Sequence, residues 1–230
     1  DGGLYMPDRL PRLGRDDLEG LRGRPYAEVA CRVLRPFVEG VIADDAFLAL
    51  CRDAYDFEVP LEPFGDDTWI LRLDRGPTAS FKDFAARWMA RVMQALREPG
   101  RPITVLVATS GDTGSAVGEA YRGLDGVRVV LLYPEREVSP VQKRQLDSIG
   151  ANVSALSVAG TFDECQRLVK QAFLDPDLAG LNLTSANSIN VGRILPQSVY
   201  YVYAWLKVAH GFGPVTFAIP SGNFGNSFGG

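Results

Sequence analysis

The spacing of hydrophobic and polar positions changes its period along the chain. Up to about residue 60, apolar residues recur at helical spacing, and Gly23 and Pro25 divide the first such run. A short alternating segment, Trp69–Leu73, is typical of a strand, and a helix with one apolar face is expected from Ser80 to about Arg97. From residue 103 onward, continuous apolar runs of strand length alternate with helical segments. This part of the sequence predicts a parallel α/β sheet flanked by helices.

The alternating part also indicates where to search for function. In parallel α/β sheets, ligands bind at the carboxyl ends of the strands, so the loops that follow strands carry the chemistry. The predicted strands are Ile103–Ala108, Val127–Tyr133, Asn152–Val158, Leu181–Thr184 and Val215–Ile219, and the predicted helices are Ser115–Tyr121, Pro140–Ile149, Phe162–Phe173 and Ile194–Ala209.

Composition excludes several classes of protein and site. The formal net charge of the 230 residues is −4, so the chain has no general basic surface for nucleic acid, and no apolar run is long enough to cross a membrane. The 3 cysteines are far apart, which excludes a disulfide framework and a cysteine zinc site and favours a reducing, cytoplasmic location. A single histidine excludes a histidine-based triad and a multi-histidine metal site within this chain.

Lysine is scarce among the basic residues, and one lysine occupies an unusual place. Lys82 falls in the first turn of the helix that Ser80 and Asp83 are predicted to cap, where the helix dipole disfavours a cation. This position and the neighbouring phenylalanines should lower the pKa of the amine and make it a good nucleophile for a carbonyl carbon. The alternative is a surface lysine whose ammonium group lies in water.

Two further loops have the composition of anion-binding turns. The loop at 109–114, Thr-Ser-Gly-Asp-Thr-Gly, joins a buried strand to a helix, and its N–H groups and hydroxyls can surround an anion. The loop at 220–226 has two glycines three residues apart, which lets the backbone approach a phosphate closely. It matches neither a Walker A loop nor a GxGxxG fingerprint. Either loop can also be an ordinary turn.

A fourth segment, residues 185–193, is rich in short polar side chains and precedes a long predicted helix. Its side chains can line a polar site, and Arg193 can bind a phosphate or a carboxylate. Capping of the helix is the alternative for each single residue.

Together, these segments resemble the threonine synthase family of fold-type II pyridoxal-phosphate (PLP) enzymes. The resemblance covers nearly the whole chain and rests on five motifs in the family's order, at residues 1–7, 76–83, 109–114, 185–190 and 221–225. It implies an α/β fold of the tryptophan synthase β type, with parallel helix-flanked sheets in two domains and a helical N-terminal segment. The implied division is a segment at 1–60, a large PLP domain that includes 61–100 and 210–230, and a smaller α/β domain at 101–209.

The resemblance also implies roles for individual residues. Lys82 is similar to the catalytic lysine that binds PLP covalently, and the loop at 222–226 is similar to the cradle of the cofactor phosphate. No metal ligand is implied. The implied cofactor-binding residues are Lys82, Asn187, Ser188, Gly222, Asn223, Phe224, Gly225 and Asn226, and the implied substrate-binding residues are Ser110, Gly111, Asp112 and Thr113 for a carboxylate and Ser188 and Arg193 for a phosphate.

The implied activity is the conversion of O-phospho-L-homoserine and water to L-threonine and phosphate. A small molecule is therefore the expected partner, with no nucleic acid or membrane, and the expected assembly is a monomer or homodimer. Another fold-type II enzyme, such as a serine or threonine dehydratase or a paralogue with a different substrate, stays open. A non-catalytic module that only binds anions stays open as well.

Two residues and the length depart from the family pattern. Arg75 stands where the family often has histidine, and Asn226 stands where it often has aspartate. Both changes are expected to tune the substrate preference, Arg75 by adding a positive charge near the site. The family continues for about as many residues again, so we expect this chain to be a fragment. The residue that contacts the cofactor's pyridine nitrogen is expected beyond Gly230.

Overall fold

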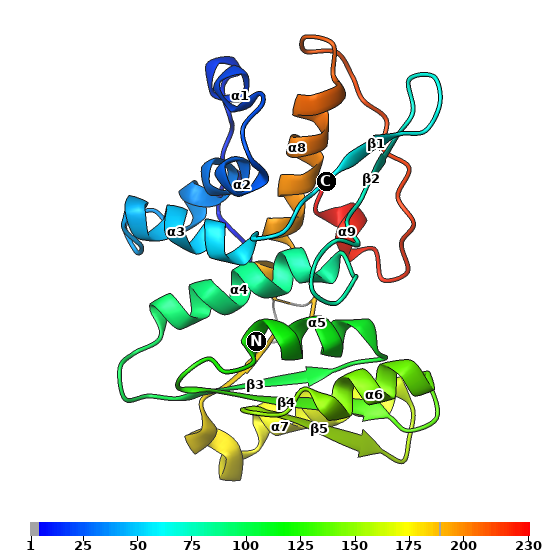
Figure 1. Cartoon of the computed structure of the whole chain (residues 1–230). Coiled ribbons are helices and arrows are strands. Elements are labelled where there is room, and N and C mark those ends of the chain that lie inside the picture. Colours follow the sequence, from blue (N-terminus) through cyan, green and yellow to red (C-terminus); the bar gives the residue numbers. More distant parts are fainter. Residues whose placement is uncertain (1–4, 189) are drawn as a thin grey trace.

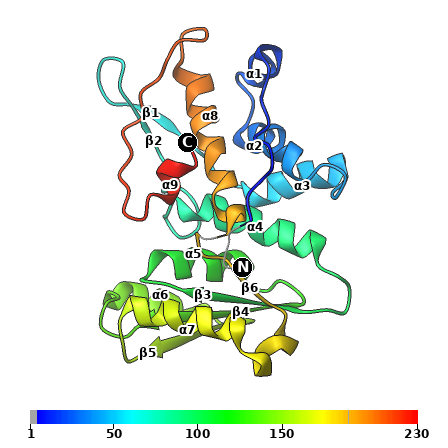
Figure 2. The ribbon, with the colours of Figure 1, turned by 180° about the vertical axis from the view of Figure 1, so that it is seen from behind.

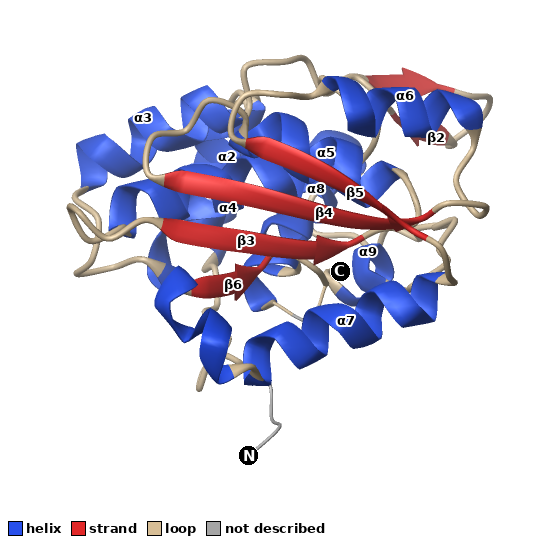
Figure 3. Cartoon of the chain, turned by 90° about the horizontal axis from the view of Figure 1, so that it is seen from below, coloured by secondary structure: helices blue, strands red, loops and turns tan. Residues whose placement is uncertain are grey.

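A four-stranded parallel sheet forms the base of the molecule in the computed structural model, which describes residues 5–188 and 190–230 (Figure 1). The strand order is β5-β4-β3-β6, and Figure 3 shows the four strands running in one direction. The sheet confirms the predicted strand–helix alternation, with bounds within about two residues of those expected. Its strands are β3 (Ile103–Ala108), β4 (Val127–Pro134), β5 (Val153–Val158) and β6 (Leu183–Ser185).

Alternate residues of the central strand β3 contribute to two hydrophobic cores, one on each face of the sheet. In β3, Val105 and Val107 join the larger core on the side of α5 (Asp112–Tyr121) and α6 (Pro140–Ser148). Leu106 and Ala108 point to the other face and pack with Cys165 and Val169 of α7 (Phe162–Leu174). Figure 2 shows α7 on the side of the sheet opposite α5. Burial on both faces explains why β3 is apolar at every position but one.

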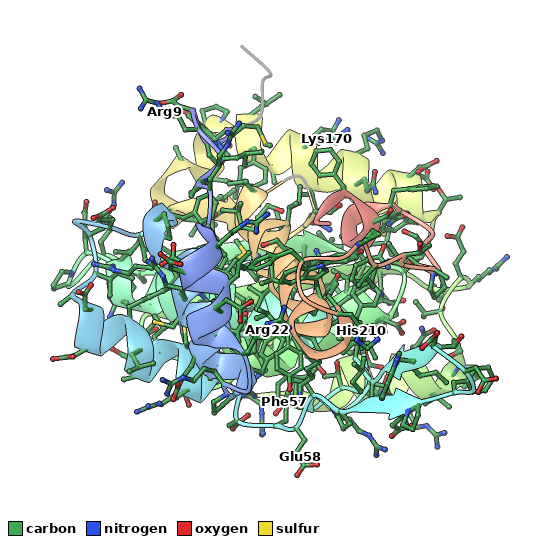
Figure 4. All side chains as sticks on the ribbon, turned by 90° about the horizontal axis from the view of Figure 1, so that it is seen from above. Arg9, Arg22, Phe57, Glu58, Lys170 and His210 are labelled. Carbon is green, nitrogen blue, oxygen red and sulfur yellow. The ribbon has the colours of Figure 1, made fainter. Side chains whose placement is uncertain are left out.

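Helix α4 (Lys82–Leu96) lies on α5 and connects the sheet layer to a helical region above it. There, edge-to-face aromatic contacts join α2 to α4 and α8, with the Tyr26 ring 5.2 Å from Phe84 and 5.0 Å from Tyr203, and α3 packs against α2 and α4. Arg22 closes the C-terminal end of α8 by donating to the Leu206 carbonyl at 2.8 Å, and Figure 4 shows Arg22 and His210 near one another. The helices of this region are α1 (Arg15–Leu21), α2 (Tyr26–Leu34), α3 (Asp44–Ala54) and α8 (Ser198–Val208).

The remaining elements are short. An antiparallel pair, β1 (Leu61–Pro63) and β2 (Trp69–Leu71), projects beside the segment that follows α8, and α9 (Gly225–Phe228) closes the described chain. Short 3₁₀ helices are η1 (Arg35–Phe37), η2 (Pro176–Leu181), η3 (Val191–Arg193) and η4 (Leu195–Gln197). No helix within residues 5–188 and 190–230 has the length and apolarity to cross a membrane.

Three local predictions are wrong. The strand expected at 215–219 is not formed, because no other strand of the described chain lies beside it to pair with. The helix expected at 194–209 is interrupted, since Pro196 enters η4 and α8 begins only at Ser198. The capping box of Ser80 and Asp83 is not formed, because Phe81 is the N-cap residue of α4 and the Ser80 hydroxyl accepts instead from the Lys82 N–H at 3.3 Å.

Other sequence predictions have a mixed outcome. The helix expected from Ser115 begins three residues earlier, at Asp112. The three-part domain division stays a prediction, and α8, which it places in the smaller domain, packs against α2 of the helical region. Residues 1–4 of the opening motif and Ile189 lie outside the described residues.

Candidate functional site

A cleft of about 370 Å³ opens at the carboxyl ends of β3 and β6, which is where parallel α/β sheets bind their ligands. Its volume lies within the range of small-molecule sites. It brings together nearly all predicted site residues, from segments far apart in the chain. The predicted residues that line it are Lys82, Ser110, Asp112, Thr113, Asn187, Ser188, Arg193, Gly222, Asn223, Gly225 and Asn226. Gly111 and Phe224 are not among its lining residues.

Lys82 is the first residue of α4, and its side chain is only 24 % exposed. Its Nζ lies 3.7 Å from Asp112 Oδ2 and 4.8 Å from the centre of the Phe81 ring. Burial lowers the pKa of Lys82, the Arg193 charge lowers it further, and Asp112 opposes the shift. The expected lowering of this pKa is therefore supported, although burial is its main cause.

The backbone before Lys82 is held by Asp83, which is 1 % exposed. The carboxylate of Asp83 accepts hydrogen bonds from the Thr78 N–H at 2.9 Å and the Thr78 hydroxyl at 2.6 Å. Gly76 is required here, because a Cβ at this position would lie 2.5 Å from Asp83 Oδ2. Burial raises the pKa of Asp83, against the effect of these hydrogen bonds. Asp83 thus fixes the entry to α4 in place of the predicted capping box.

The loop after β3 is organised by a side chain that the sequence did not single out. The buried hydroxyl of Thr109 accepts hydrogen bonds from the N–H groups of Gly111, at 3.0 Å, and Gly114, at 2.8 Å. It also donates to the Gly111 carbonyl at 3.1 Å. The Gly111 N–H is thus used inside the loop. The Ser110 and Thr113 hydroxyls line the cleft and have no hydrogen-bond partner within the part of the chain that the structure describes.

Asn187 extends the sheet at the inner wall of the cleft. Its side-chain amide donates to the Ala108 carbonyl at 2.8 Å and accepts from the Ala108 N–H at 3.2 Å. Ser185 donates to the same Asn187 oxygen at 3.2 Å. Asn187 therefore fixes the end of β3 while it faces the cleft, and Ser188, which follows it, is exposed there.

Arg193 is 5 % exposed and reaches the cleft from η3. Its Nη1 donates to the Ala186 carbonyl at 2.6 Å, while its buried Nε has no hydrogen-bond partner among the described residues. Burial lowers the pKa of Arg193 to about 10, and Tyr121 and Asp83 oppose this shift. A buried guanidinium without a paired carboxylate is a favourable place for an anion.

The opposite wall is the loop 220–226, which internal hydrogen bonds hold closed. Asn226 donates to the Pro220 carbonyl at 2.9 Å and accepts from the Ser221 hydroxyl at 2.5 Å. The Tyr201 hydroxyl donates to the Asn226 carbonyl at 2.6 Å. An aspartate in place of Asn226 would lack the N–H that reaches Pro220, so this loop is built for the amide that the chain has.

Arg75 does not contribute to the cleft, contrary to the expectation of an added charge near the site. It is about half exposed, lies 3.5 Å from Glu62 of β1, and is absent from the lining. Its charge is paired with an acidic residue on the hairpin.

Several lining residues were missed by the sequence analysis. One group belongs to α7 and shares the spacing of a single helix face, and a second comprises glutamines of α6 and η4. The helical spacing was visible in the sequence, but nothing in it showed that this face of α7 overhangs the strand ends. Lys170, which Figure 4 labels, is among the missed residues. They are Phe162, Gln166, Val169, Lys170, Gln142 and Gln197.

Comparison with known proteins agrees with this geometry. The model of the family described as "Pyridoxal-phosphate dependent enzyme" matches residues 58–229, and a model described as "Threonine synthase N terminus" matches residues 1–55. The chain belongs to the family of pyridoxal-phosphate dependent enzymes. Its α/β architecture confirms the predicted fold class, and the cleft of this family member is formed by residues within the first match.

The curated relatives of this pyridoxal-phosphate dependent enzyme include two bacterial proteins named threonine synthase. The chain is 42 % identical over 238 residues to that of Pseudomonas aeruginosa, covering 100 % of this chain and 51 % of the relative. It is 37 % identical over 226 residues to that of Escherichia coli, covering 97 % of this chain and 53 % of the relative. The chain therefore spans about half the length of the curated relatives it matches.

Solved structures give the same result for the fold. The PLP-bound threonine synthase from Brucella melitensis matches with a TM-score of 0.90 and 43 % identity, over 99 % of this chain and 51 % of that chain. The threonine synthase from yeast matches with a TM-score of 0.84 and 34 % identity, over 99 % of this chain and 49 % of that chain. The described part of this pyridoxal-phosphate dependent enzyme has the fold-type II arrangement of these structures.

Proposed function

We propose that the protein binds PLP covalently through Lys82 and converts O-phospho-L-homoserine and water to L-threonine and phosphate. The observation that carries this proposal is that one cleft brings together a largely buried amine with a lowered pKa, a glycine loop and a buried arginine that has no paired carboxylate among the described residues. The curated relatives and matched structures are named threonine synthase, which supports threonine as the product. The cytoplasmic location and the monomeric or homodimeric state stay predictions.

The residues of the cleft fit this cofactor. Gly222 faces the cleft, has no positive φ and would meet nothing within 4 Å if it carried a Cβ. The fold therefore does not itself require glycine there, whereas the close approach of a bound phosphate would. Asn223, Gly225 and Asn226 complete this cradle, with Phe224 at its bend. Asn187 and Ser188 would lie beside the cofactor ring.

The bound cofactor supplies an electron sink for a negative charge that develops on the substrate carbons. The protein contributes positioning and proton transfer. The ε-amine of Lys82, with its pKa lowered by burial, can hold and release a proton near neutral pH more readily than an exposed lysine. Asp112, 3.7 Å away, orients that amine.

The substrate's two anionic groups would bind at different walls of the cleft. We assign the carboxylate to Ser110 and Thr113, in the loop that Gly111 and Asp112 shape, because their side chains are free. We assign the phosphate to Arg193 and Ser188, because the Nε of the buried guanidinium has no hydrogen-bond partner among the described residues. The Asp112 carboxylate faces Lys82 and so does not oppose the substrate carboxylate directly.

Borohydride reduction followed by peptide mass mapping tests the cofactor assignment. Reduction should fix the pyridoxyl group on the peptide that contains Lys82. Lys82→Ala should abolish both the label and the absorbance of the bound cofactor, while Lys143→Ala, which removes a lysine outside the cleft, should leave both in place. A pyridoxyl group on another lysine would contradict the assignment.

Incubation with O-phospho-L-homoserine tests the reaction. Equal amounts of threonine and phosphate support the proposal. Release of a keto acid and ammonia identifies a dehydratase, and cofactor binding without turnover of either kind identifies a module that only binds anions.

A further inference from the structure

A glutamine of α6 reaches across to the carboxylate that faces Lys82. Gln142 Nε2 donates to Asp112 Oδ1 at 2.8 Å, and the other oxygen of that carboxylate lies 3.7 Å from Lys82 Nζ. The three side chains line the same cleft and come from α6, α5 and α4. Asp112 is 54 % exposed, so without this contact its side chain would be free to turn into water.

Gln142 itself is fixed by the start of α6. The side-chain Oε1 of Gln142 accepts from the backbone N–H of Ser139 at 3.1 Å. The backbone N–H of Gln142 donates to the Ser139 hydroxyl at 3.2 Å, which completes a capping box. Both ends of the Gln142 amide are therefore used: the oxygen binds the helix start and the nitrogen binds Asp112.

The loop after β3 leaves room for this contact. Gly111 has a φ of +136°, and a Cβ on it would lie 2.4 Å from Gln142 Nε2. Glycine at this position thus permits both the positive φ of the turn and the close packing of the Gln142 side chain. The same amide nitrogen thus packs against Gly111 and donates to Asp112, which gives the glutamine a defined position.

We propose that Gln142 is a positioning residue that holds the Asp112 carboxylate against the amine of Lys82. The significance of this role for catalysis rests on the proposed function, in which Lys82 binds the cofactor. The charged groups that face Lys82 are Asp112 from α5 and Arg193 from η3, and Lys170 of α7 lines the same cleft. Asp112 is the acidic group among them, so its placement sets how strongly the effect of burial on the amine is opposed.

The test measures the pH dependence of Lys82 acetylation by acetic anhydride in the full chain after removal of bound cofactor, with mass mapping of the Lys82 peptide. Asp112→Asn should raise the rate at pH 8 roughly fivefold, the effect of one unit charge about 4 Å away in water-like surroundings. Gln142→Met should raise it in the same direction by a smaller factor. Gln142→Asn, whose amide is too short to reach Asp112, should behave like Gln142→Met.

A double-mutant cycle separates positioning from general support of the helix. In the Asp112→Asn background, Gln142→Met should have no further effect on the acetylation rate. Ser139→Ala removes the hydroxyl of the capping box but keeps the donor to Asp112, so it should leave the rate unchanged. Gln145→Met, on the exposed side of the same helix, is the matched control.

Two results would overturn the proposal. One is an unchanged acetylation rate in both Gln142→Met and Gln142→Asn. The other is an effect of Gln142→Met that persists when Asp112 is already asparagine. A reduced pyridoxyl group found on a residue other than Lys82 would instead contradict the proposed function, and the effect of Gln142 on Asp112 and Lys82 would still stand.

Discussion

The two loops that form opposite walls of the cleft are built in different ways. The loop at 109–114 follows a strand that is paired on both sides, by β4 and β6, and its turn is closed by the buried Thr109 hydroxyl. The loop at 220–226 follows a segment with no strand beside it in the described chain, and side-chain contacts of Asn226 hold it.

The exposed fractions of the side chains before and within the two loops show the same contrast. Val105 and Val107 of β3 are fully buried, whereas Phe217, in the apolar segment expected to form a strand, is 37 % exposed. Phe224, at the bend of the second loop, is 68 % exposed. The first wall therefore takes its geometry from the packed sheet, and the second depends on a few local hydrogen bonds. Substitutions in the first wall should cost stability, and those in the second should chiefly change ligand binding.

The largest expected difference between the two walls comes from placing the same side chain in both. Gly114→Val should lower the free energy of unfolding by about 2–3 kcal/mol, because even its Cβ would lie 2.6 Å from both Leu146 and Thr109 side-chain atoms. Gly222→Val should change it by less than about 0.5 kcal/mol, because a Cβ there meets nothing within 4 Å, and should weaken binding of PLP. Urea unfolding and cofactor titration measure both effects.

Equal losses of unfolding free energy in the two variants would show that the second wall is as constrained as the first. A loss confined to Gly222→Val would reverse the comparison.

A smaller effect comes from removing one hydroxyl in each wall. Thr109→Val should cost about 1–2 kcal/mol of unfolding free energy, because two buried N–H groups, those of Gly111 and Gly114, lose their acceptor. Ser221→Ala should cost less, because Ser221 only donates to the side chain of Asn226, in a partly exposed loop. Denaturant midpoints rank the two, and amide hydrogen exchange should rise at Gly111 and Gly114 in the first variant.

Ser110→Ala, an exposed change beside Thr109, is the control for that measurement. If exchange at Gly111 and Gly114 stays slow in Thr109→Val, the hydroxyl is not what holds the turn.

The same contrast explains which strands could be predicted from the sequence. The strand at 103–108 was predictable to the residue, because a strand buried on both faces must be apolar throughout and its pairing partners lie in this chain. The run at 215–219 has a similar pattern but no partner strand among the described residues, and pairing is what converts such a pattern into a strand.

The site was predictable where its chemistry has a local signature. Lys82 at a helix start and the two glycine-containing loops stand out in the sequence, and all three line the cleft. Gln142 and Lys170 do not stand out, because their relevance depends on which helix face overhangs the strand ends. Arg75 was misjudged for the same reason, since sequence distance does not reveal the ion pair with Glu62.

The smallest expected effect concerns Lys82, whose side chain lines the cleft between the two walls. Its pKa in the folded protein lies below the value of 10.5 for an unperturbed lysine, mainly because of burial. In the pH range between these two values the unfolded chain binds more protons, so stability rises with pH across that range, and the buried cation costs stability below it. Lys82→Met should therefore be slightly more stable than the unaltered protein at pH 7, and its advantage should shrink as the pH approaches 10.5. Urea unfolding at several pH values measures this, with Lys143→Met as the control for loss of one charge outside the cleft. An advantage that grows with pH, or a less stable Lys82→Met at neutral pH, would mean that Asp112 and the Phe81 ring stabilise the cation by more than burial costs.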